Sequence, residues 1–336
     1  MTMLQTACFS LVAACLALYY VLGGSGLGAG MLGPVLARTE AEKRAFARAL
    51  APAWASSLVW LLAALACLFA AFPSAFSSLL SAFSLPVALA ALGLLSCALA
   101  LAFSLRDGRL AGFRGVLLFC GSLLPALLFG FVLGACIQGV PLDADGDFTG
   151  AFSDLLRPLP LLCALLGLVT VLMQGASWLA LKIERGSRLQ QRARHTRLVL
   201  QIATILLFVA VAAFYLLGHG LQLNEGAALV VQVAALAAIV VGVVAGFLAG
   251  GRGNDLFPFL AGSLVCAGLV ALFSASIFPD FIVSTGTGAS VSIARSQADA
   301  SVLTLVCMAA CVGVPLAAAS HAAVHRLFRG RVALDR

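Results

Sequence analysis

The stretch that decides the fold is residues 115–137, GVLLFCGSLLPALLFGFVLGACI. No charged side chain occurs anywhere in it. A helix needs about 20 consecutive apolar residues to cross the hydrocarbon core of a bilayer, and this stretch is long enough. It therefore predicts a transmembrane helix.

The composition of the whole chain agrees with this interpretation. Of its 336 residues, 62% are hydrophobic and 10% are charged, whereas soluble domains carry roughly 25% charged residues. Such an apolar excess is typical of a protein whose surface faces lipid. The net charge of +7 does not indicate nucleic-acid binding, because no stretch interleaves basic and aromatic residues as a strand-binding groove does.

Stretches like the first recur along the chain and predict an all-α polytopic membrane protein with about nine transmembrane helices. No part of the chain is typical of a soluble domain, so residues 1–336 form a single integral membrane domain. The predicted segments are 5–30, 55–72, 78–104, 115–137, 158–182, 198–218, 227–249, 257–279 and 300–323.

Basic residues separate the connections into two sets. The connections 34–53, 105–114, 182–197 and 250–256 and the C-terminal tail hold 18 of the 20 Lys and Arg residues. The other connections hold only Arg157 and Arg295, and one of them, 138–156, is rich in Asp. Since basic loops stay on the cytoplasmic side, the N-terminus is expected outside and the C-terminus in the cytoplasm. An odd number of helices satisfies this alternation.

Two weaker patterns concern the arrangement of the helices. Gly121-Ser122 and Gly262-Ser263 suggest repeat halves, 5–137 and 158–279, each a bundle of four helices, with 300–323 as a peripheral helix. The glycines of 23–30 have small-xxx-small spacing, which indicates close helix packing. A nucleotide-binding glycine loop is disfavoured there, because no strand precedes the glycines.

Few residues offer chemistry inside the predicted helices. Ionisable residues in a membrane are functional candidates because burying a charge in lipid is costly, but the predicted spans contain almost none. Their polar groups are more often hydrogen bonds within or between helices than sites. His321 and His325 are four apart, as in a metal or haem site, although polar anchors at the interface are the preferred interpretation. The deep polar residues are Ser56, Ser57, Gln174, Ser177 and Thr204.

Several short motifs, in order, resemble subunit II of the cytochrome bd-type ubiquinol oxidases, including the cyanide-insensitive branch. The similarity is best over roughly residues 20–185, and its most specific parts are 138–141 and 174–178. The motifs are Leu27-Gly28-Ala29-Gly30-Met31-Leu32, Glu42-Lys43-Arg44, Ala51-Pro52-Ala53-Trp54, Val59-Trp60-Leu61, Phe72-Pro73, Gly121-Ser122, Gln138-Gly139-Val140-Pro141, Gln174-Gly175-Ala176-Ser177-Trp178 and Phe278-Pro279.

The resemblance implies a role for the chain. It would be the non-haem subunit of a quinol:oxygen oxidoreductase in a bacterial cytoplasmic membrane, stabilising a subunit I that carries haems b and d. It would itself be non-catalytic and bind no haem or metal. A structural quinone, a small single-helix subunit and the lipid bilayer are the other partners implied. Candidate polar-path or helix-packing positions are Ser56, Ser57, Trp60, Gln174 and Trp178.

The chain departs from the family pattern where relatives carry acidic residues. Gly23 and Gly26 stand at two such positions on the first helix, and Ala53-Trp54-Ala55 replaces a His-Trp-Asp run. In relatives these carboxylates serve proton delivery within the membrane. Protons would then travel through subunit I, or through hydroxyls and water near Ser56 and Ser57. Two alternatives stay open, a membrane transporter or channel and a structural paralogue without the oxidase role.

Overall fold

A computed structural model describes residues 2–103, 111–219, 226–250, 254–328 and 330–334. Within these residues, nine helices are long and apolar enough to cross a membrane. They are α1 (Met3–Leu36), α2 (Glu40–Ala71), α3 (Pro73–Phe103), α4 (Ala111–Gln138), α5 (Pro158–Lys182), α6 (Arg188–His219), α7 (Ala227–Gly250), α8 (Leu256–Ile277) and α10 (Ala300–Leu327). The predicted all-α membrane fold is confirmed.

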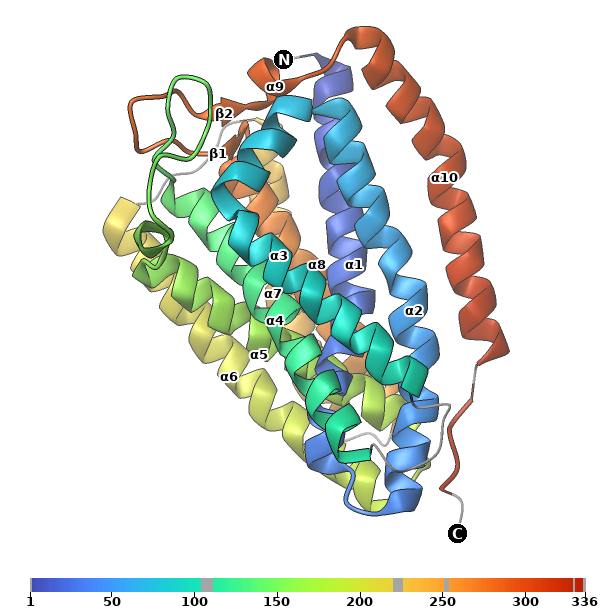
Figure 1. Cartoon of the computed structure of the whole chain (residues 1–336). Coiled ribbons are helices and arrows are strands. Elements are labelled where there is room, and N and C mark those ends of the chain that lie inside the picture. The colour runs from blue at the N-terminus through green and yellow to red at the C-terminus, as the bar shows by residue number, and fades with distance from the viewer. Residues whose placement is uncertain (1, 104–110, 220–225, 251–253, 329, 335–336) are drawn as a thin grey trace.

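The remaining elements are short and lie at one end of the molecule. The 3-10 helix η2 (Phe152–Leu155) precedes α5, and β1 (Asp280–Ile282) pairs antiparallel with β2 (Val291–Ser292) before the short helix α9 (Ile293–Ser296). Figure 1 shows the strands and α9 beside the N-terminus, whereas the C-terminus lies at the opposite end.

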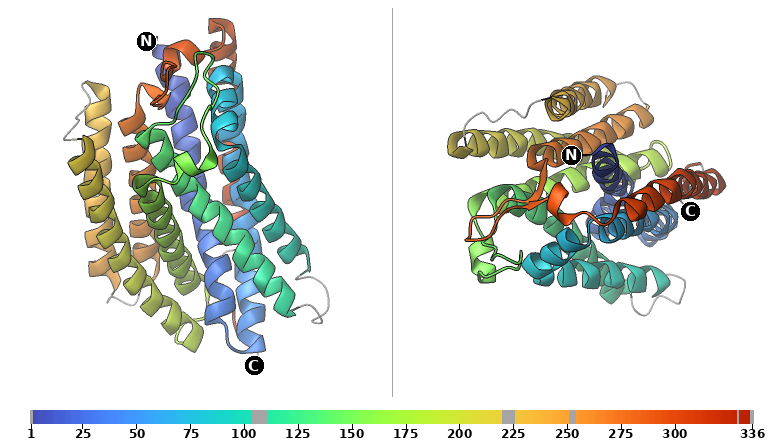
Figure 2. Two further views of the ribbon diagram at one scale, coloured as in Figure 1. Left: turned by 60° about the vertical axis from the view of Figure 1, so that its left-hand side comes forward. Right: turned by 90° about the horizontal axis from the view of Figure 1, so that it is seen from above.

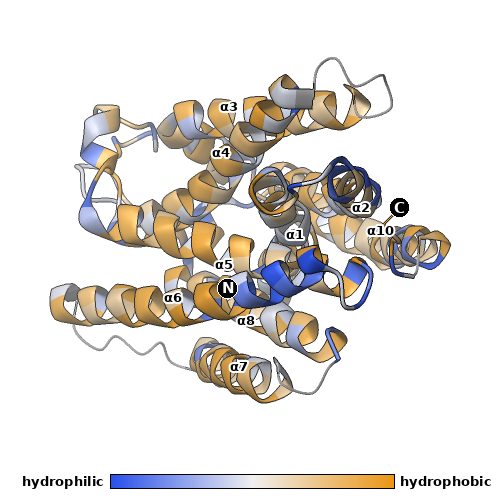
Figure 3. Cartoon of the chain, turned by 90° about the horizontal axis from the view of Figure 1, so that it is seen from below, coloured by the Kyte–Doolittle hydropathy of each residue, from blue (hydrophilic) through white to orange (hydrophobic). Residues whose placement is uncertain are grey.

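Helices α1 and α5 lie at the centre of the molecule. α1 packs against α2, α4, α5 and α8, and α5 also packs against α4, α6 and α8. α10 packs against α2 and α1 and stands at the edge (Figure 2). It is therefore peripheral, while the division into two repeat halves stays a prediction. Hydrophobic residues make up most of the long helices (Figure 3), as a lipid environment requires.

Glycines let the two central helices meet. A Cβ at Gly28 of α1 would collide with the Val171 carbonyl of α5, and one at Gly175 of α5 with the Ala29 amide. Only glycine permits backbones to approach this closely. The close packing predicted from residues 23–30 is confirmed.

Two helix starts differ from the sequence prediction by ten residues or more. α2 begins at Glu40, where Thr39 and Glu42 form a capping box, and not at residue 55. α6 begins at Arg188, and not at residue 198. Hydropathy marks the part of a helix that lies in lipid and misses charged turns that continue beyond it, which is why 40–53 and 188–197 were assigned to connections.

A third helix shows a local kink. The helical conformation of α3 is interrupted at Phe83, whose φ and ψ are −117° and 27°. Pro86 follows three residues later, and a proline inside a helix removes one hydrogen bond and crowds the preceding turn.

Some basic residues of the predicted connections lie outside the described residues. They are Arg106, Arg109, Arg252, Arg329 and Arg336.

Candidate functional site

The structure brings two of the predicted positions to the inner face of α10. The Nδ1 atom of His321 lies 3.3 Å from the carbonyl oxygen of Ser56 on α2. The His325 ring stands edge-on to Trp178 of α5, with 5.6 Å between ring centroids, and the two imidazole centroids are 4.5 Å apart. Ser56, Trp178, His321 and His325 therefore form one group, which we call the histidine cluster.

The sequence favours these histidines as polar anchors at the interface and does not indicate their contact with α2 and α5. The signal was the spacing of four, which puts both rings on one helix face. The partner helices could not be inferred, because residues 56 and 321 are remote in sequence. The Lys182 ammonium lies beside the cluster, 5.0 Å from the centre of the Trp178 ring, a cation–π distance.

The imidazole pair does not fit a haem held by two histidines. Both rings project from one helix and lie against each other, whereas such ligands approach the iron from opposite sides of the porphyrin. Among the described residues, no three His, Cys, Asp or Glu side chains gather as a group that could hold a metal ion.

Ser57 and Trp60 lie deeper on α2. Both are buried, and the Ser57 hydroxyl donates to the Trp54 carbonyl at 2.8 Å. The indole N–H groups of Trp54 and Trp60 are buried, and neither has a hydrogen-bond partner within the part of the chain that the structure describes. α2 thus presents two indole donors and a hydroxyl oxygen close together in sequence.

The glycine positions on α1 leave little space for longer side chains. A Cβ at Gly26 would lie 3.3 Å from the Trp54 Cα, and one at Gly23 would lie 2.7 Å from the Tyr19 ring. Ala55 is exposed. The close packing of α1 against Trp54 therefore leaves little space for a carboxylate side chain at position 26.

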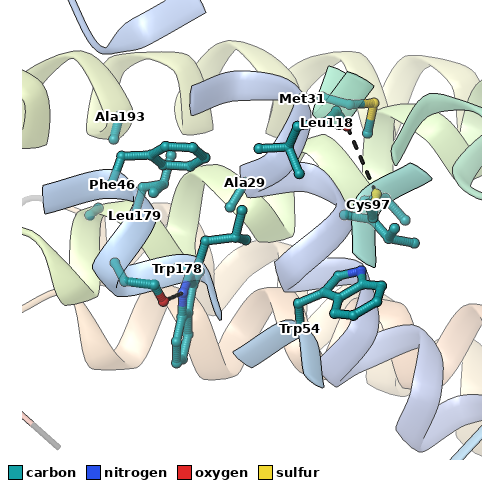
Figure 4. Close-up of a cluster of buried hydrophobic side chains, with 14 of the residues drawn as sticks. Ala29, Met31, Phe46, Trp54, Cys97, Leu118, Trp178, Leu179 and Ala193 are labelled. Atoms are coloured by element: carbon teal, nitrogen blue, oxygen red, sulfur yellow. Dashed lines mark hydrogen bonds between the residues drawn. The ribbon is translucent and has the colours of Figure 1, made fainter. Parts of the chain in front are cut away.

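Gln174 and Trp178 join α5 to neighbouring helices. Figure 4 shows Trp178 within a cluster of buried hydrophobic side chains. The Gln174 side chain is fully buried, and its Nε2 donates to the Ser263 hydroxyl of α8 at 2.7 Å. The Trp178 Nε1 donates to the Ala49 carbonyl of α2 at 3.3 Å. Both contacts are of the helix-packing kind.

Asp255 is the centre of a charged network that sequence reasoning missed. It is 2% exposed, and it accepts hydrogen bonds from Arg194 Nε at 2.7 Å, Arg331 Nη2 at 2.7 Å and Gln190 Nε2 at 2.9 Å. Burial raises the pKa of this carboxyl, but the bonds from Arg194 and Arg331 outweigh burial, and the net pKa lies below its ordinary value. The network joins α6, α8 and the C-terminal tail.

A second ion pair lies at the same end. Arg192 of α6 pairs with Glu42 of α2 and also donates to the Leu36 carbonyl at the end of α1. The pairs of Asp255 and Glu42 together tie α1, α2, α6, α8 and the tail. The available signal was the presence of acidic residues within basic segments, because buried carboxylates require cationic partners.

A cavity of about 390 Å³ also lies at this end, between α1, α2, α3 and α4. Its walls are mostly apolar and include Phe46, Leu50 and Leu118, while Lys43 and Arg114 add positive charge. This combination suits an amphiphile with an apolar body and hydrogen-bond acceptors on its polar part.

Comparisons of this chain with known families, sequences and structures all find the same kind of protein. Residues 4–328 match the family model described as cytochrome bd terminal oxidase subunit II. The chain is 30% identical over 198 residues to a probable cytochrome oxidase subunit 2 of Haemophilus influenzae, a match that covers 57% of this chain and 52% of the relative. It is 26% identical over 344 residues to cytochrome bd ubiquinol oxidase subunit 2 of Bacillus subtilis, covering 99% and 98%.

The match to Escherichia coli cytochrome bd-I ubiquinol oxidase subunit 2 is 27% identical and covers 60% of this chain and 54% of the relative. The chain thus spans about half the length of the first curated relatives it matches. Its fold is similar to a solved bd oxidase of Geobacillus thermodenitrificans, with a TM-score of 0.80, 17% identity and coverage of 98% of this chain and 99% of that one. The chain belongs to the cytochrome bd terminal oxidase subunit II family.

Proposed function

We propose that this protein is the non-haem subunit II of a bd-type quinol oxidase. In this role it stabilises a haem-bearing subunit I, which oxidises quinol and reduces oxygen to water. The observation that carries the proposal is the family match over nearly the whole chain. Haem, when bound in the complex, supplies the electron transfer and oxygen chemistry from the partner, and the residues of this chain hold and orient helices.

The proposed orientation places the N-terminus outside and the C-terminus in the cytoplasm of a bacterial inner membrane. Its support is the charge at the two ends of the molecule. The Asp255 and Glu42 networks lie at the end with the C-terminus, together with Lys43, Arg44 and Arg48 of α2 and the arginines at the start of α6. Positive side chains stay on the cytoplasmic side during insertion. A reporter enzyme that is active only outside the membrane should stay inactive at the C-terminus and become active when fused to the N-terminus.

We propose a polar path along α2 that uses Ser56, Ser57 and Trp60 together with water. Support comes from the imidazole of His321, which contacts the Ser56 carbonyl. Water chains conduct protons when polar groups hold them, and an imidazole can accept and release one. Gln174 and Trp178 serve helix packing in this proposal, because both bond across helix pairs.

We also propose that this chain binds a structural quinone, and the 390 Å³ cavity supports this. Phe46, Leu50 and Leu118 offer the apolar walls that a quinone ring and its isoprenoid tail need, and Lys43 or Arg114 can donate to a quinone carbonyl. A small single-helix subunit is a further proposed partner.

Purification of the native complex from membranes tests the proposal. We expect an equimolar larger partner, the visible spectrum of b and d haems in the complex, and no haem absorbance in this chain after separation. A partner-free, stable protein would contradict it. Unchanged quinol-dependent oxygen uptake and haem content after deletion would indicate the structural paralogue, and solute uptake by proteoliposomes of this chain alone would indicate a transporter.

A further inference from the structure

A small cavity lies between α5, α6, α7 and α8, away from the histidine cluster and the 390 Å³ cavity. Its volume is about 10 Å³. Glycines of α7 and α8 face it, because Gly242, Gly246 and Gly262 are among its lining residues. Its polar walls come from Ser177, Arg197, Gln201 and Thr204.

Arg197 is the unusual member of this set. Sequence reasoning assigned it to a connection, but it lies in the third turn of α6 and is 2% exposed. Its Nε and Nη1 atoms are buried and have no hydrogen-bond partner among the described residues. The nearby carboxylate, Asp255, already accepts from Arg194, Arg331 and Gln190. A buried donor without a partner is destabilising, and more so when it is charged.

The oxygens of the cavity show which occupant fits. The Ser177 hydroxyl donates to the Met173 carbonyl and the Thr204 hydroxyl to the Leu200 carbonyl, both at 2.9 Å. Each hydroxyl proton is therefore engaged, and each oxygen offers the cavity lone pairs only. Arg197 in contrast offers only protons. The occupant must accept from Arg197 and donate to these oxygens.

Gln174 adds a further acceptor close to the cavity. Its Oε1 atom is buried and has no partner in the described part of the chain. A Cβ at Gly262, which lines the cavity, would lie 2.6 Å from this atom. A chloride ion would satisfy Arg197 but would face the lone pairs of Gln174, Ser177 and Thr204, whereas water satisfies both kinds of group.

We propose that this space, the Arg197 cavity, binds a water molecule that accepts from the Arg197 guanidinium and donates to Ser177 or Thr204. A water molecule needs a cavity of about 10–15 Å³ on this measure and two to four polar partners, so the size admits roughly one. The guanidinium charge gives the cavity a positive potential, which disfavours hydronium and other cations, as arginines do in water-selective pores. We therefore expect the cavity to hold water between α5, α6, α7 and α8 and not to conduct protons.

The test is a structure of the native complex at a resolution that shows ordered water, in chloride buffer and in gluconate buffer of equal ionic strength. We expect density within hydrogen-bond distance of Arg197 Nε or Nη1 and of a hydroxyl oxygen in both buffers. An empty cavity overturns the proposal. Density seen only in chloride also overturns it, because the occupant is then an anion.

Variants provide the second readout. Ser177→Ala removes one acceptor, and we expect weaker density and a thermal midpoint about 2 °C below that of Ser25→Ala. Ser25 is a matched control, since it is 2% exposed, donates to the Leu22 carbonyl and does not line the cavity. Equal midpoints and unchanged density in the two variants would contradict the assignment. Arg197→Met should remove the density, and density that persists in it would show that Arg197 does not hold the occupant.

Discussion

The two ends of the helices are held together by different forces. At the basic end, where α2, α6 and α8 begin, ion pairs of Asp255 and Glu42 join helices and the C-terminal tail. At the acidic end, where β1, β2 and α9 lie, the connection 139–157 pairs through its backbone with 283–288. Gly288 N donates to the Leu142 carbonyl at 2.9 Å, and Val140 N to the Val283 carbonyl at 2.9 Å.

The difference follows from the charges that each end contains. The basic end has a surplus of guanidinium groups, so each buried carboxylate there collects several donors. The acidic end contains Asp143, Asp145, Asp147 and Asp154, which gain little from one another, and backbone hydrogen bonds do the joining. Charge that sets topology during insertion also decides which interactions stabilise each end.

Asp255→Asn should have the largest effect, because it removes the charge shared by Arg194 and Arg331 and leaves both cations less compensated. Loss of one partner from a buried ion pair costs about 3 kcal/mol or more. We expect a marked drop in the thermal midpoint of the purified complex. Glu40→Gln is the control, since the Glu40–Lys43 pair is exposed, and a similar drop there would show that ion pairs at this end act without regard to burial.

Gly288→Ala should disrupt the loop pairing at the acidic end. Its Cβ would collide with the Asp143 carbonyl, a backbone atom that moves only with its loop, and we expect a loss of about 2 kcal/mol. The thermal midpoint measures it. Gly313→Ala on α10, where a Cβ meets nothing within 4 Å, should leave the midpoint unchanged or slightly raised. Equal effects would mean that the loop pairing contributes nothing.

The two ends should respond oppositely to pH. The pKa of Asp255 is lowered, since its arginine bonds outweigh burial, so its stabilisation is present above the unfolded pKa of about 3.9 and is lost as pH falls through the folded pKa. Burial raises the pKa of Asp280, so its stabilisation is present below about pH 3.9 and is lost as pH rises through the folded value.

Thermal midpoints measured from pH 3 to pH 7 separate these effects. The deficit of Asp255→Asn relative to the unmodified protein should shrink towards pH 3. Asp280→Asn should be the more stable protein at pH 7 and lose that advantage at pH 3. Parallel curves for all three proteins would contradict both assignments.

Gly115→Leu should have the smallest effect on stability, because the nearest atom to a Cβ there is Pro34 Cβ at 3.9 Å and Gly115 lines the 390 Å³ cavity. We expect a nearly unchanged midpoint and loss of co-purified quinone, measured by extraction and chromatography. The same change at Gly313 should keep the quinone. Full quinone content in Gly115→Leu would remove this cavity from the proposal.

Much of the fold could be predicted from local sequence. Apolar runs such as 115–137 correspond to single helices, and the glycines of 23–30 correctly predict close packing. The starts of α2 and α6 could not be placed, because a hydropathy pattern reports the lipid environment and not the helix. Arg197 was missed for that reason, since a charged residue ten positions into α6 looks like part of a connection.

The candidate sites depended on contacts between distant residues. Ser56 was singled out on its hydroxyl and His321 on its spacing from His325, but nothing local indicates that they touch. Asp255 meets Arg194 and Arg331 from two other parts of the chain. Pairing of this kind is set by how helices pack, and a single sequence carries no signal for it.

The sequence by itself determined the membrane class, the number of apolar runs and the uneven distribution of charge, because transfer into lipid depends on the local composition of each segment. Only the tertiary structure decided that Asp255 would be shared by two arginines, that α1 would meet α5 at glycines, and that Arg197 would be enclosed by four helices. Each of these depends on which helix faces lie against each other, and that is a property of the packed chain.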